Sequence, residues 1–358
     1  MNLPLLIAES IIEKRECILV TGAAGFIGAR LVESLLNYGF NNLRLLVRPT
    51  ARLTRLKQVL EKHDAPGVQL VQGNLLSRED CRRAVNNVSL IYHLAAGRGE
   101  KSYASAYLNS VVITRNLIEA ALEQTVLKRF VSISSISVYD CRLNRKPQSL
   151  DEGQPLVDRA EVRGDPYCFA KVHQDRLVMK LGRDHNFPYV IVRPGYVYGP
   201  GNSGIPGRVG IGTFGIFLHL AGFNRLPLTY VDNCADAILL SGLKSGIAGE
   251  VFNVVDDELA TGWKFLRLYK KNVRTFPSLY LPHSVSYLLC WLWEKYSDWS
   301  EEQLPRAFNR SRWASYWRGN KYPNTKIKTM VGWMPRTTLM EGLANYFTFE
   351  KGGNSKDA

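Results

Sequence analysis

The sequence predicts an α/β fold, in which a doubly wound parallel sheet is joined to a smaller, mixed C-terminal region. Three observations indicate it: strand-like runs alternate with helix-like segments, a glycine-rich turn follows the first run, and the composition changes after about residue 200. Such alternation is typical of a parallel sheet with helices on both faces. With 46% hydrophobic and 22% charged residues, the composition excludes a disordered, collagen-like or coiled-coil protein.

The expected strands are short runs rich in Val, Ile and Leu, with little alternation of polar residues. Such runs are typical of strands buried on both faces of a sheet. They are Cys17–Val20, Leu43–Val47, Gln69–Gln72, Leu90–His93, Phe130–Ser134 and Tyr189–Arg193. Amphipathic segments such as Ala29–Leu36 and Val112–Glu123 separate them and predict helices.

A glycine-rich turn follows the first expected strand, where residues 18–28 read Ile-Leu-Val-Thr-Gly-Ala-Ala-Gly-Phe-Ile-Gly. Gly22 permits a tight turn, Gly25 lets the backbone approach a pyrophosphate, and Gly28 allows close contact between helix and strand. The positive end of the next helix favours phosphate. Because strand, turn and helix follow in the required order, the segment predicts a dinucleotide-binding domain of the Rossmann type.

The end of the second expected strand indicates which dinucleotide binds. NAD sites usually carry Asp or Glu there, to bind the ribose 2′-hydroxyl. Here residues 41–60 hold no acidic residue, and a guanidinium at Arg48 suits a 2′-phosphate. NADP is therefore predicted over NAD, which stays the alternative, and a solvated basic helix face is the alternative for the later cations. The basic residues are Arg44, Arg48, Arg52, Arg55 and Lys57.

Tyr167 and Lys171 are four residues apart and would share one face of a helix, which Asp165 caps and Pro166 begins. A nearby ammonium lowers the pKa of a phenol, which makes the tyrosine a usable general acid/base. An exposed helical pair is the alternative. Two segments favour catalysis: residues 129–139 form a strand ending in hydroxyls, and residues 92–96 end another strand with small side chains.

Together these segments resemble the extended branch of the short-chain dehydrogenase/reductase superfamily, the NAD-dependent epimerase/dehydratase family, from about Cys17 to Tyr346. Asn74 stands where this branch usually has Asp. The segments that carry the resemblance are Thr21–Gly28, Gly73–Leu75, His93–Ala96, Asn109, Ser135, Val138-Tyr139, Tyr167–Lys171, Arg193–Gly201 and Tyr230–Asn233.

The resemblance implies roles for individual residues. Tyr167 would pass a proton, Lys171 would tune Tyr167 and hold the nicotinamide ribose, and Ser135 would orient the substrate oxygen. Asn109 completes the expected catalytic group. The expected cofactor contacts are Gly22, Gly25, Phe26, Ile27, Gly28, Arg48, Asn74, Leu75, Leu94, Ala95, Ala96, Tyr167, Lys171, Pro194 and Val197.

The same resemblance indicates which reactions of this branch the chain can be expected to catalyse. Nucleotide-sugar 4,6-dehydratases of this branch carry an Asp-Glu pair directly after the catalytic hydroxyl, where this chain has Ile136 and Ser137. That dehydration is therefore disfavoured, whereas alcohol oxidation, carbonyl reduction and epimerisation need only Ser135, Tyr167 and Lys171. A non-catalytic protein that senses NADP is a further alternative, disfavoured because such members typically lose the Tyr/Lys pair.

A nucleotide-sugar substrate is favoured by Arg98, Arg208 and Arg225 near the expected pocket, with Arg208 or Arg225 as a pyrophosphate clamp and Tyr196 as a further candidate contact. For each arginine alone, a solvated surface position is the alternative. Leu279–Trp293, together with Val47-Arg48, resembles 3β-hydroxysteroid dehydrogenase-like members instead and favours a lipophilic alcohol or ketone. This segment is expected to be a helix packed on the core, with an apolar pocket wall or a peripheral membrane contact as alternatives.

The change near residue 200 predicts the organisation of the chain. Residues 1–200 are expected to form the dinucleotide-binding domain, residues 201–350 a substrate-binding region and residues 351–358 a flexible tail. Gly199–Gly215 holds seven glycines and two prolines and is expected to be a loop. Val251–Val255 is expected to return to the main sheet. The segments Val112–Glu123 and Tyr167–Leu181 resemble helices of a four-helix dimer interface, which implies a homodimer.

The remaining features mostly exclude functions. Six scattered cysteines without a C-x-x-C pair indicate a reducing compartment, and we expect the cytoplasm. No histidine spacing suits a metal, no spanning segment is expected, and no motif beyond the net charge of +14 indicates nucleic acid. Residues 303–340 hold eight basic residues and no acidic one, and the sequence indicates no partner for them.

Overall fold

A seven-stranded parallel sheet forms the centre of the computed structural model, which describes residues 10–63, 65–97, 99, 102–141, 146–300, 303 and 308–354. Each observed strand begins and ends within one residue of its expected position, and the predicted fold class is confirmed. The strand order is β11 (Val251–Val254), β6 (Tyr189–Pro194), β5 (Arg129–Ile133), β4 (Leu90–His93), β1 (Ile18–Thr21), β2 (Leu43–Val47) and β3 (Val68–Gln72).

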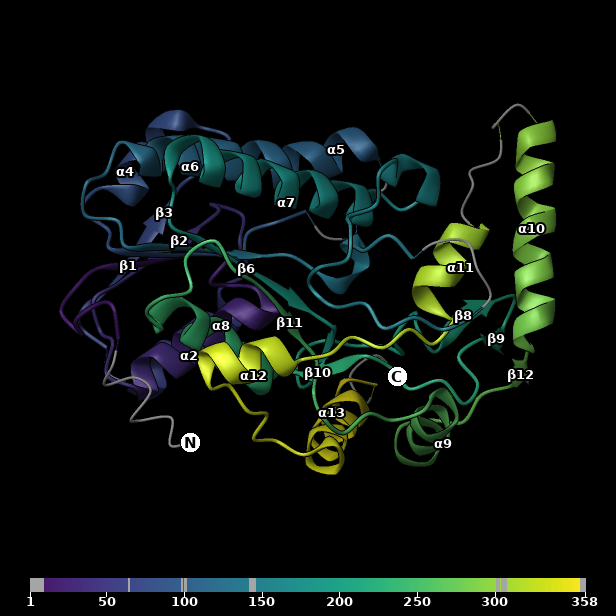
Figure 1. Ribbon diagram of the computed structural model, residues 1–358. Coiled ribbons are helices and arrows are strands. Elements are labelled where there is room, and N and C mark those ends of the chain that lie inside the picture. The colour runs from purple at the N-terminus through teal and green to yellow at the C-terminus, as the bar shows by residue number, and fades with distance from the viewer. Residues whose placement is uncertain are drawn as a thin grey trace.

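Helices cover both faces of this sheet (Figure 1). Successive side chains of a strand point to opposite faces, so Ile18 and Val20 enter one buried cluster while Leu19 enters the other. This explains why the strands read as continuous apolar runs. One face carries α2 (Phe26–Asn37), α8 (Val231–Leu243) and α12 (Thr325–Val331), and the other carries α4 (Arg78–Val85), α5 (Tyr103–Tyr107), α6 (Ile113–Leu122) and α7 (Pro166–His185).

Two further features lie beside the main helices. The expected helix Val112–Glu123 is found as α6, but a π-helical turn, η1 (Leu108–Val112), joins it to α5. Such turns widen a helix locally and are frequent at functional sites. Helix α3 (Thr54–His63) packs against α2, and two short 3₁₀ turns, η2 (Ile136–Val138) and η3 (Ala160–Arg163), precede α7.

The C-terminal region is mixed, as expected, and holds two small sheets. The expectation of a pure loop over Gly199–Gly215 is wrong at its end, because β8 pairs there with the next strand in an antiparallel hairpin. One sheet pairs β7 (Tyr196–Tyr198) with β10 (Leu228–Tyr230), and the other has the order β12 (Ser278–Tyr280), β9 (Ile216–His219), β8 (Gly210–Thr213). The helices are α9 (Gly262–Asn272), α10 (His283–Trp299), α11 (Arg310–Tyr316) and α13 (Leu339–Asn354).

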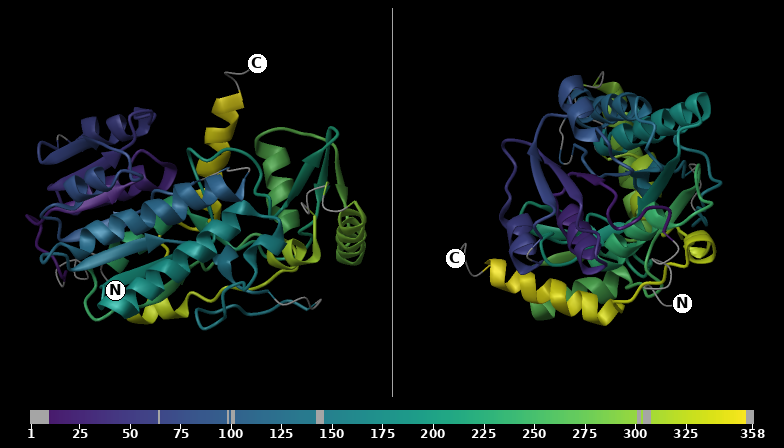
Figure 2. Two further views of the ribbon diagram at one scale, coloured as in Figure 1. Left: turned by 90° about the horizontal axis from the view of Figure 1, so that it is seen from above. Right: turned by 90° about the vertical axis from the view of Figure 1, so that its left-hand side faces the viewer.

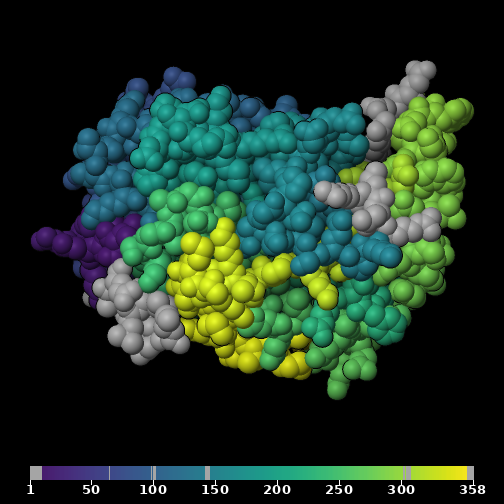
Figure 3. All heavy atoms as spheres, viewed as in Figure 1, coloured from purple at the N-terminus to yellow at the C-terminus, as the bar shows by residue number. Residues whose placement is uncertain are grey.

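Helix α10 stands at the end of the molecule farthest from β3 (Figure 2) and forms one edge of its surface (Figure 3). The expectation that this apolar segment packs on the core is wrong for most of its large side chains. The fully buried positions of the helix are Ser286, Cys290 and Ser297. In the described part of the chain, no helix combines the length and the apolar character that crossing a membrane requires.

Candidate active site

A pocket of about 1000 Å³ lies at the carboxyl edge of the main sheet. Residues that directly follow the strands line it, including Gly22 after β1, Leu94 after β4 and Gly195 after β6. This is where doubly wound sheets place their ligands. All the cofactor-contact candidates line this pocket, as do the catalytic candidates Ser135 and Asn109.

The glycine turn has the geometry that a dinucleotide requires. Gly22 has a left-handed φ of 71°, and a side chain there would meet the backbone of Leu94 and Ala95 at the end of β4. A side chain at Gly28 would overlap the Gly22 carbonyl group. Gly25 begins α2 without a side-chain cap, so the helix presents its first amides to the pocket. These residues therefore fit a bound pyrophosphate.

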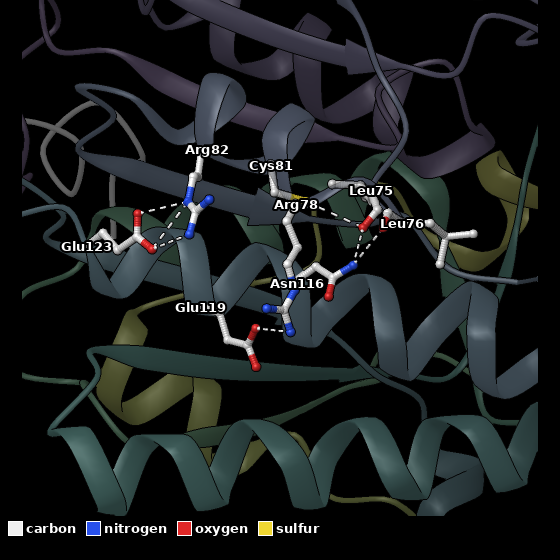
Figure 4. Close-up of polar contacts among 8 residues, drawn as sticks. All are labelled: Leu75, Leu76, Arg78, Cys81, Arg82, Asn116, Glu119 and Glu123. Atoms are coloured by element: carbon white, nitrogen blue, oxygen red, sulfur yellow. Dashed lines mark hydrogen bonds and ion pairs between the residues drawn. The ribbon is translucent and has the colours of Figure 1, made fainter.

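The segment after β3 is anchored from α6 and α4 (Figure 4). Asn116 Nδ2 donates to the carbonyl oxygens of Leu75 and Leu76 at 3.0 and 3.2 Å, and Cys81 Sγ donates to Leu75 O at 3.5 Å. Leu75 lines the pocket, so these bonds fix one of its walls. Sequence reasoning missed Asn116, although an amide on the apolar face of an amphipathic helix is a signal of a buried polar contact.

Asn74, at the position where Asp is usual, is fixed locally. Its backbone N–H donates to Asp80 Oδ2 at 2.7 Å, and its side-chain oxygen accepts from Leu76 N at 3.0 Å. The Asn74 side chain therefore shapes its own turn at the pocket wall.

The five basic residues near β2 separate into distinct positions. Arg48 and Arg52 are exposed and line the pocket. Arg44 instead donates to the carbonyl oxygens of Ala84 and Asn86, and Arg55 donates to Gly201 O at 2.6 Å. Lys57 is exposed and does not line the pocket. Of the five basic residues, only Arg48 and Arg52 are therefore placed to contact a dinucleotide in the pocket.

The start of α7 is held from two directions. Asp165 Oδ1 accepts hydrogen bonds from Tyr167 N and Cys168 N, at 3.1 and 3.3 Å, so it caps the helix as expected. The other carboxylate oxygen accepts from the Tyr316 hydroxyl of α11 at 3.0 Å. Tyr316 also lines the pocket, so α11 connects the pocket wall to the cap of the helix that carries Tyr167.

Lys171 is buried, and its Nζ donates to Ile133 O at 2.6 Å and to Gln174 Oε1 at 2.9 Å. Burial lowers the pKa of Lys171 to about 8, with the opposing charge of Asp175 acting in the other direction. The ammonium form therefore still dominates at neutral pH.

A buried hydrogen-bond network connects Lys171 to β1. Gln174 Nε2 donates a hydrogen bond to Thr114 Oγ1 at 3.0 Å. The same Thr114 oxygen lies 2.8 Å from His93 Nε2, and the other ring nitrogen, His93 Nδ1, lies 2.8 Å from Thr21 Oγ1. Burial and the nearby Lys171 lower the pKa of His93 to about 3, so its ring is neutral at pH 7. The network joins the cofactor turn to the candidate catalytic helix, and sequence reasoning missed Gln174 and Thr114.

Tyr139, the second residue of the Val138-Tyr139 pair, does not line the pocket. It is fully buried, its hydroxyl donates to Asn253 Oδ1 at 2.6 Å, and the Arg193 guanidinium lies 4.8 Å from its ring centroid. Arg193 in turn pairs with Asp175 at 3.0 Å, and both charged side chains are buried. The pair joins β6 to α7, and removing either partner would leave an uncompensated buried charge.

The residues expected to contact the substrate differ in whether they line the pocket. Arg208 lines the pocket, is 6% exposed, donates to Ser315 O at 2.8 Å and lies 4.9 Å from the Tyr316 ring centroid. Tyr196 also lines the pocket, whereas Arg225 is exposed and does not. Arg98 lies outside the described residues.

The described pocket lining is strongly basic. It contains Arg48, Arg52, Lys171 and Arg208 and, within the part of the chain that the structure describes, no Asp or Glu. Ile136 and Ser137 line it directly after Ser135. In those described ranges, no group of three or more His, Cys, Asp or Glu residues is placed to hold a metal ion. The arrangement suits anionic ligands.

Comparisons with known proteins agree with this geometry. The model of the NAD dependent epimerase/dehydratase family matches residues 18–254, more than half of the chain, and the protein belongs to this family. The resemblance to the extended short-chain dehydrogenase/reductase branch is confirmed, and the protein is a nicotinamide-dependent enzyme.

Several relatives extend over nearly the whole chain. The 3beta-hydroxysteroid-dehydrogenase/decarboxylase isoform 1 of Arabidopsis thaliana is 25% identical over 92% of this chain and 78% of the plant protein. The sterol-4-alpha-carboxylate 3-dehydrogenase (decarboxylating) of Mus musculus is 23% identical over 93% of this chain and 90% of its own. The UDP-glucuronic acid 4-epimerase from Bacillus cereus, solved with NAD, shares the fold with a TM-score of 0.70, at 21% identity over 94% and 99% of the two chains.

Proposed function

We propose that this enzyme oxidises a secondary alcohol or reduces a ketone by hydride transfer, with NADP favoured over NAD. One observation carries the proposal: Ser135, Tyr167 and Lys171 line the same pocket as the glycine turn that fits a pyrophosphate. The bound nicotinamide supplies the site that accepts or donates the hydride. Epimerisation would use the same residues, with the hydride returned to the same substrate.

Tyr167 is the proposed general acid/base. In the direction of oxidation, the Tyr167 phenolate accepts the substrate's hydroxyl proton while hydride leaves the carbinol carbon. Positively charged Lys171, on the same side of α7, favours that phenolate. Ser135 Oγ accepts a hydrogen bond from Ser137 N at 3.2 Å, which leaves its O–H to donate to the substrate oxygen. Asn109, on the π-helical turn, supports the pocket wall.

Arg48 and Arg52 support the preference for NADP. Replacing both by Gln is expected to weaken NADP binding by about 10- to 100-fold and leave NAD binding within about threefold, because two charge-assisted contacts to the 2′-phosphate are lost. Fluorescence titration of NADPH and NADH measures both constants. Lys57→Gln is the matched control, since it removes an exposed cation outside the pocket. Equal weakening of both dinucleotides, or none, would contradict the assignment.

The substrate end of the pocket carries Arg208. Because its guanidinium is nearly buried, held by Ser315 O and next to the Tyr316 ring, it is preorganised for an anionic substituent. The basic pocket favours a nucleotide sugar, whose diphosphate would pair with Arg208. A lipophilic alcohol, such as a sterol acid, is the second candidate, because the relatives named for sterol substrates cover most of this chain.

A substrate panel tests both candidates. With UDP-glucose, UDP-glucuronic acid and a sterol 4-carboxylate as probes, reduction of NADP is followed by nicotinamide absorbance. Arg208→Leu is expected to raise the KM of the active substrate at least tenfold, because the anion loses its charged partner. Arg225→Leu, an exposed arginine outside the pocket, is the control. An unchanged KM in Arg208→Leu would contradict the anion contact, whichever substrate is used.

We also propose that the enzyme is a cytoplasmic homodimer. The cytoplasmic location rests on the six cysteines, all of which are unpaired. The dimer rests on α6 and α7, which lie side by side on one face of the sheet, away from α10 (Figure 1). Sedimentation velocity measures the oligomeric state directly.

A further inference from the structure

Helix α10 exposes most of its large apolar side chains, although Tyr287 and Trp293 pack inward against the rings of Trp313 and Phe308. Its buried positions hold Ser286, Cys290 and Ser297, whereas Leu288 and Trp299 are 51% and 78% exposed. A surface helix normally turns its apolar stripe toward the core and its polar residues toward water. The other large apolar side chains that α10 exposes are Val285, Leu289, Trp291, Leu292 and Tyr296.

Polar contacts fix this orientation. Trp313 Nε1 of α11 donates to Ser286 Oγ at 2.9 Å, and Arg310 Nε donates to Glu294 Oε2 at 2.6 Å. Both contacts bind the inner side of α10 to α11. Rotating the helix to bury its leucines would break a buried hydrogen bond and an ion pair, so the apolar side is held outward.

The apolar surface continues beyond α10. Strand β12, which precedes the helix, exposes Leu279, and the turn between β8 and β9 exposes Phe214 completely. Phe223 is also exposed, and its ring centroid lies 6.2 Å from that of Trp263 at the start of α9. These elements gather at one end of the molecule (Figures 1 and 2). We call this surface the apolar end: Phe214, Ile216, Phe223, Trp263, Leu279, Val285, Leu288, Leu289, Trp291, Leu292, Tyr296 and Trp299.

Positive charge accompanies the apolar end. Residues 259–299, which include α9 and α10, contain six basic residues and two acidic ones, Glu294 and Asp298, and Glu294 pairs with Arg310. Four of the cations, on and directly after α9, are exposed: Lys264, Arg267, Lys271 and Arg274. A surface that combines apolar side chains, Trp and Tyr rings and a basic border matches the interface of a bilayer with anionic headgroups.

We propose that the apolar end is a docking surface for an anionic lipid bilayer. Helix α10 has 17 residues, or about 25 Å, and would lie in the plane of the interface with its exposed side chains among the acyl chains. The basic residues of α9 would contact the headgroups. A second copy of this chain fits less well, because a twofold contact through this end would bring the basic α9 segments of both copies into one interface. The proposal does not depend on the catalytic chemistry.

Vesicle flotation of the full chain tests this surface. Binding to vesicles of phosphatidylcholine with phosphatidylglycerol is expected to exceed binding to phosphatidylcholine alone, and to fall as salt rises. The triple substitution Leu288→Ser, Leu292→Ser and Trp299→Ser is expected to lower partitioning at least tenfold. Leu70→Ser is the matched control, because it removes an exposed leucine on β3, at the opposite end of the molecule.

Three outcomes would overturn the proposal: no binding of the unmodified protein to either vesicle, equal binding of the triple variant, or loss of binding in the Leu70→Ser control. Retained NADP affinity shows that the variants are folded. A concentration-dependent dimer that the triple substitution abolishes in the absence of vesicles would assign this surface to a second copy instead.

Discussion

Replacing Tyr167 by Phe is expected to lower kcat for hydride transfer by about 10²- to 10⁴-fold, the usual contribution of a positioned general acid/base. The variant removes one hydroxyl and keeps the ring in its place on α7. The Asp165 cap binds the backbone amide of Tyr167, which the substitution does not alter. Dinucleotide affinity is therefore expected to stay within about threefold of the unmodified enzyme.

Tyr107→Phe is the matched control for this experiment. Tyr107 lies on α5, packs against the Phe169 ring of α7 and does not line the pocket. Steady-state kinetics with the best substrate of the panel measures both variants. Full activity in Tyr167→Phe would remove the proposed proton transfer, whereas equal losses in both variants would indicate a packing defect.

Lys171 is expected to make the stability of the folded protein depend on alkaline pH. Its pKa is about 8 in the folded state and 10.5 in the reference state, because burial disfavours the ammonium. Below about pH 8 both states are protonated, and the folded state bears the cost of a buried charge. Between about pH 8 and 10.5 the unfolded state holds more protons, so stability rises with pH, by roughly 3 kcal/mol over the window.

Comparison with Lys171→Met isolates this effect. The free energy of unfolding of the protein minus that of the variant is expected to shift in favour of the protein as pH rises through the window. Denaturant unfolding at several pH values measures the difference, in which the other titrating groups cancel. Lys180→Met, exposed on the same helix, is the control. A difference that is flat with pH would contradict the depressed pKa.

The fold was largely predictable because its signals are local. Strands buried on both faces read as continuous apolar runs, and the turn at Gly22 needs a left-handed residue at one position. Spacing along one helix was enough to place Tyr167 and Lys171 on α7, where both line the pocket. Residues that depend on distant partners were not predictable: Tyr316 reaches Asp165 across 151 positions, and Gln174 reaches Thr114 across 60.

Which arginine lines the pocket, and which side of α10 is buried, could not be predicted from the sequence, because both depend on contacts with α11. From the sequence, Arg208 and Arg225 were equal candidates for a pyrophosphate clamp. Only Arg208 lines the pocket, where Ser315 O and the Tyr316 ring of α11 contact its guanidinium. An apolar helical segment predicts burial of its apolar side. In α10 the contacts of Ser286 and Glu294 with α11 accompany an orientation that exposes most of the large apolar side chains, and no pattern within the segment indicates those contacts.

The position of β11 at the edge of the main sheet has a consequence for biosynthesis. β11 pairs with β6, yet Val254 pairs with Pro194 across a chain segment that includes β7 to β10 and α8. The ribosome must therefore synthesise that whole segment before β11 can pair with β6 and complete the sheet. Long-range parallel pairing of this kind is slow. A chain that ends before residue 251 would expose the unpaired edge of β6, which is a template for aggregation.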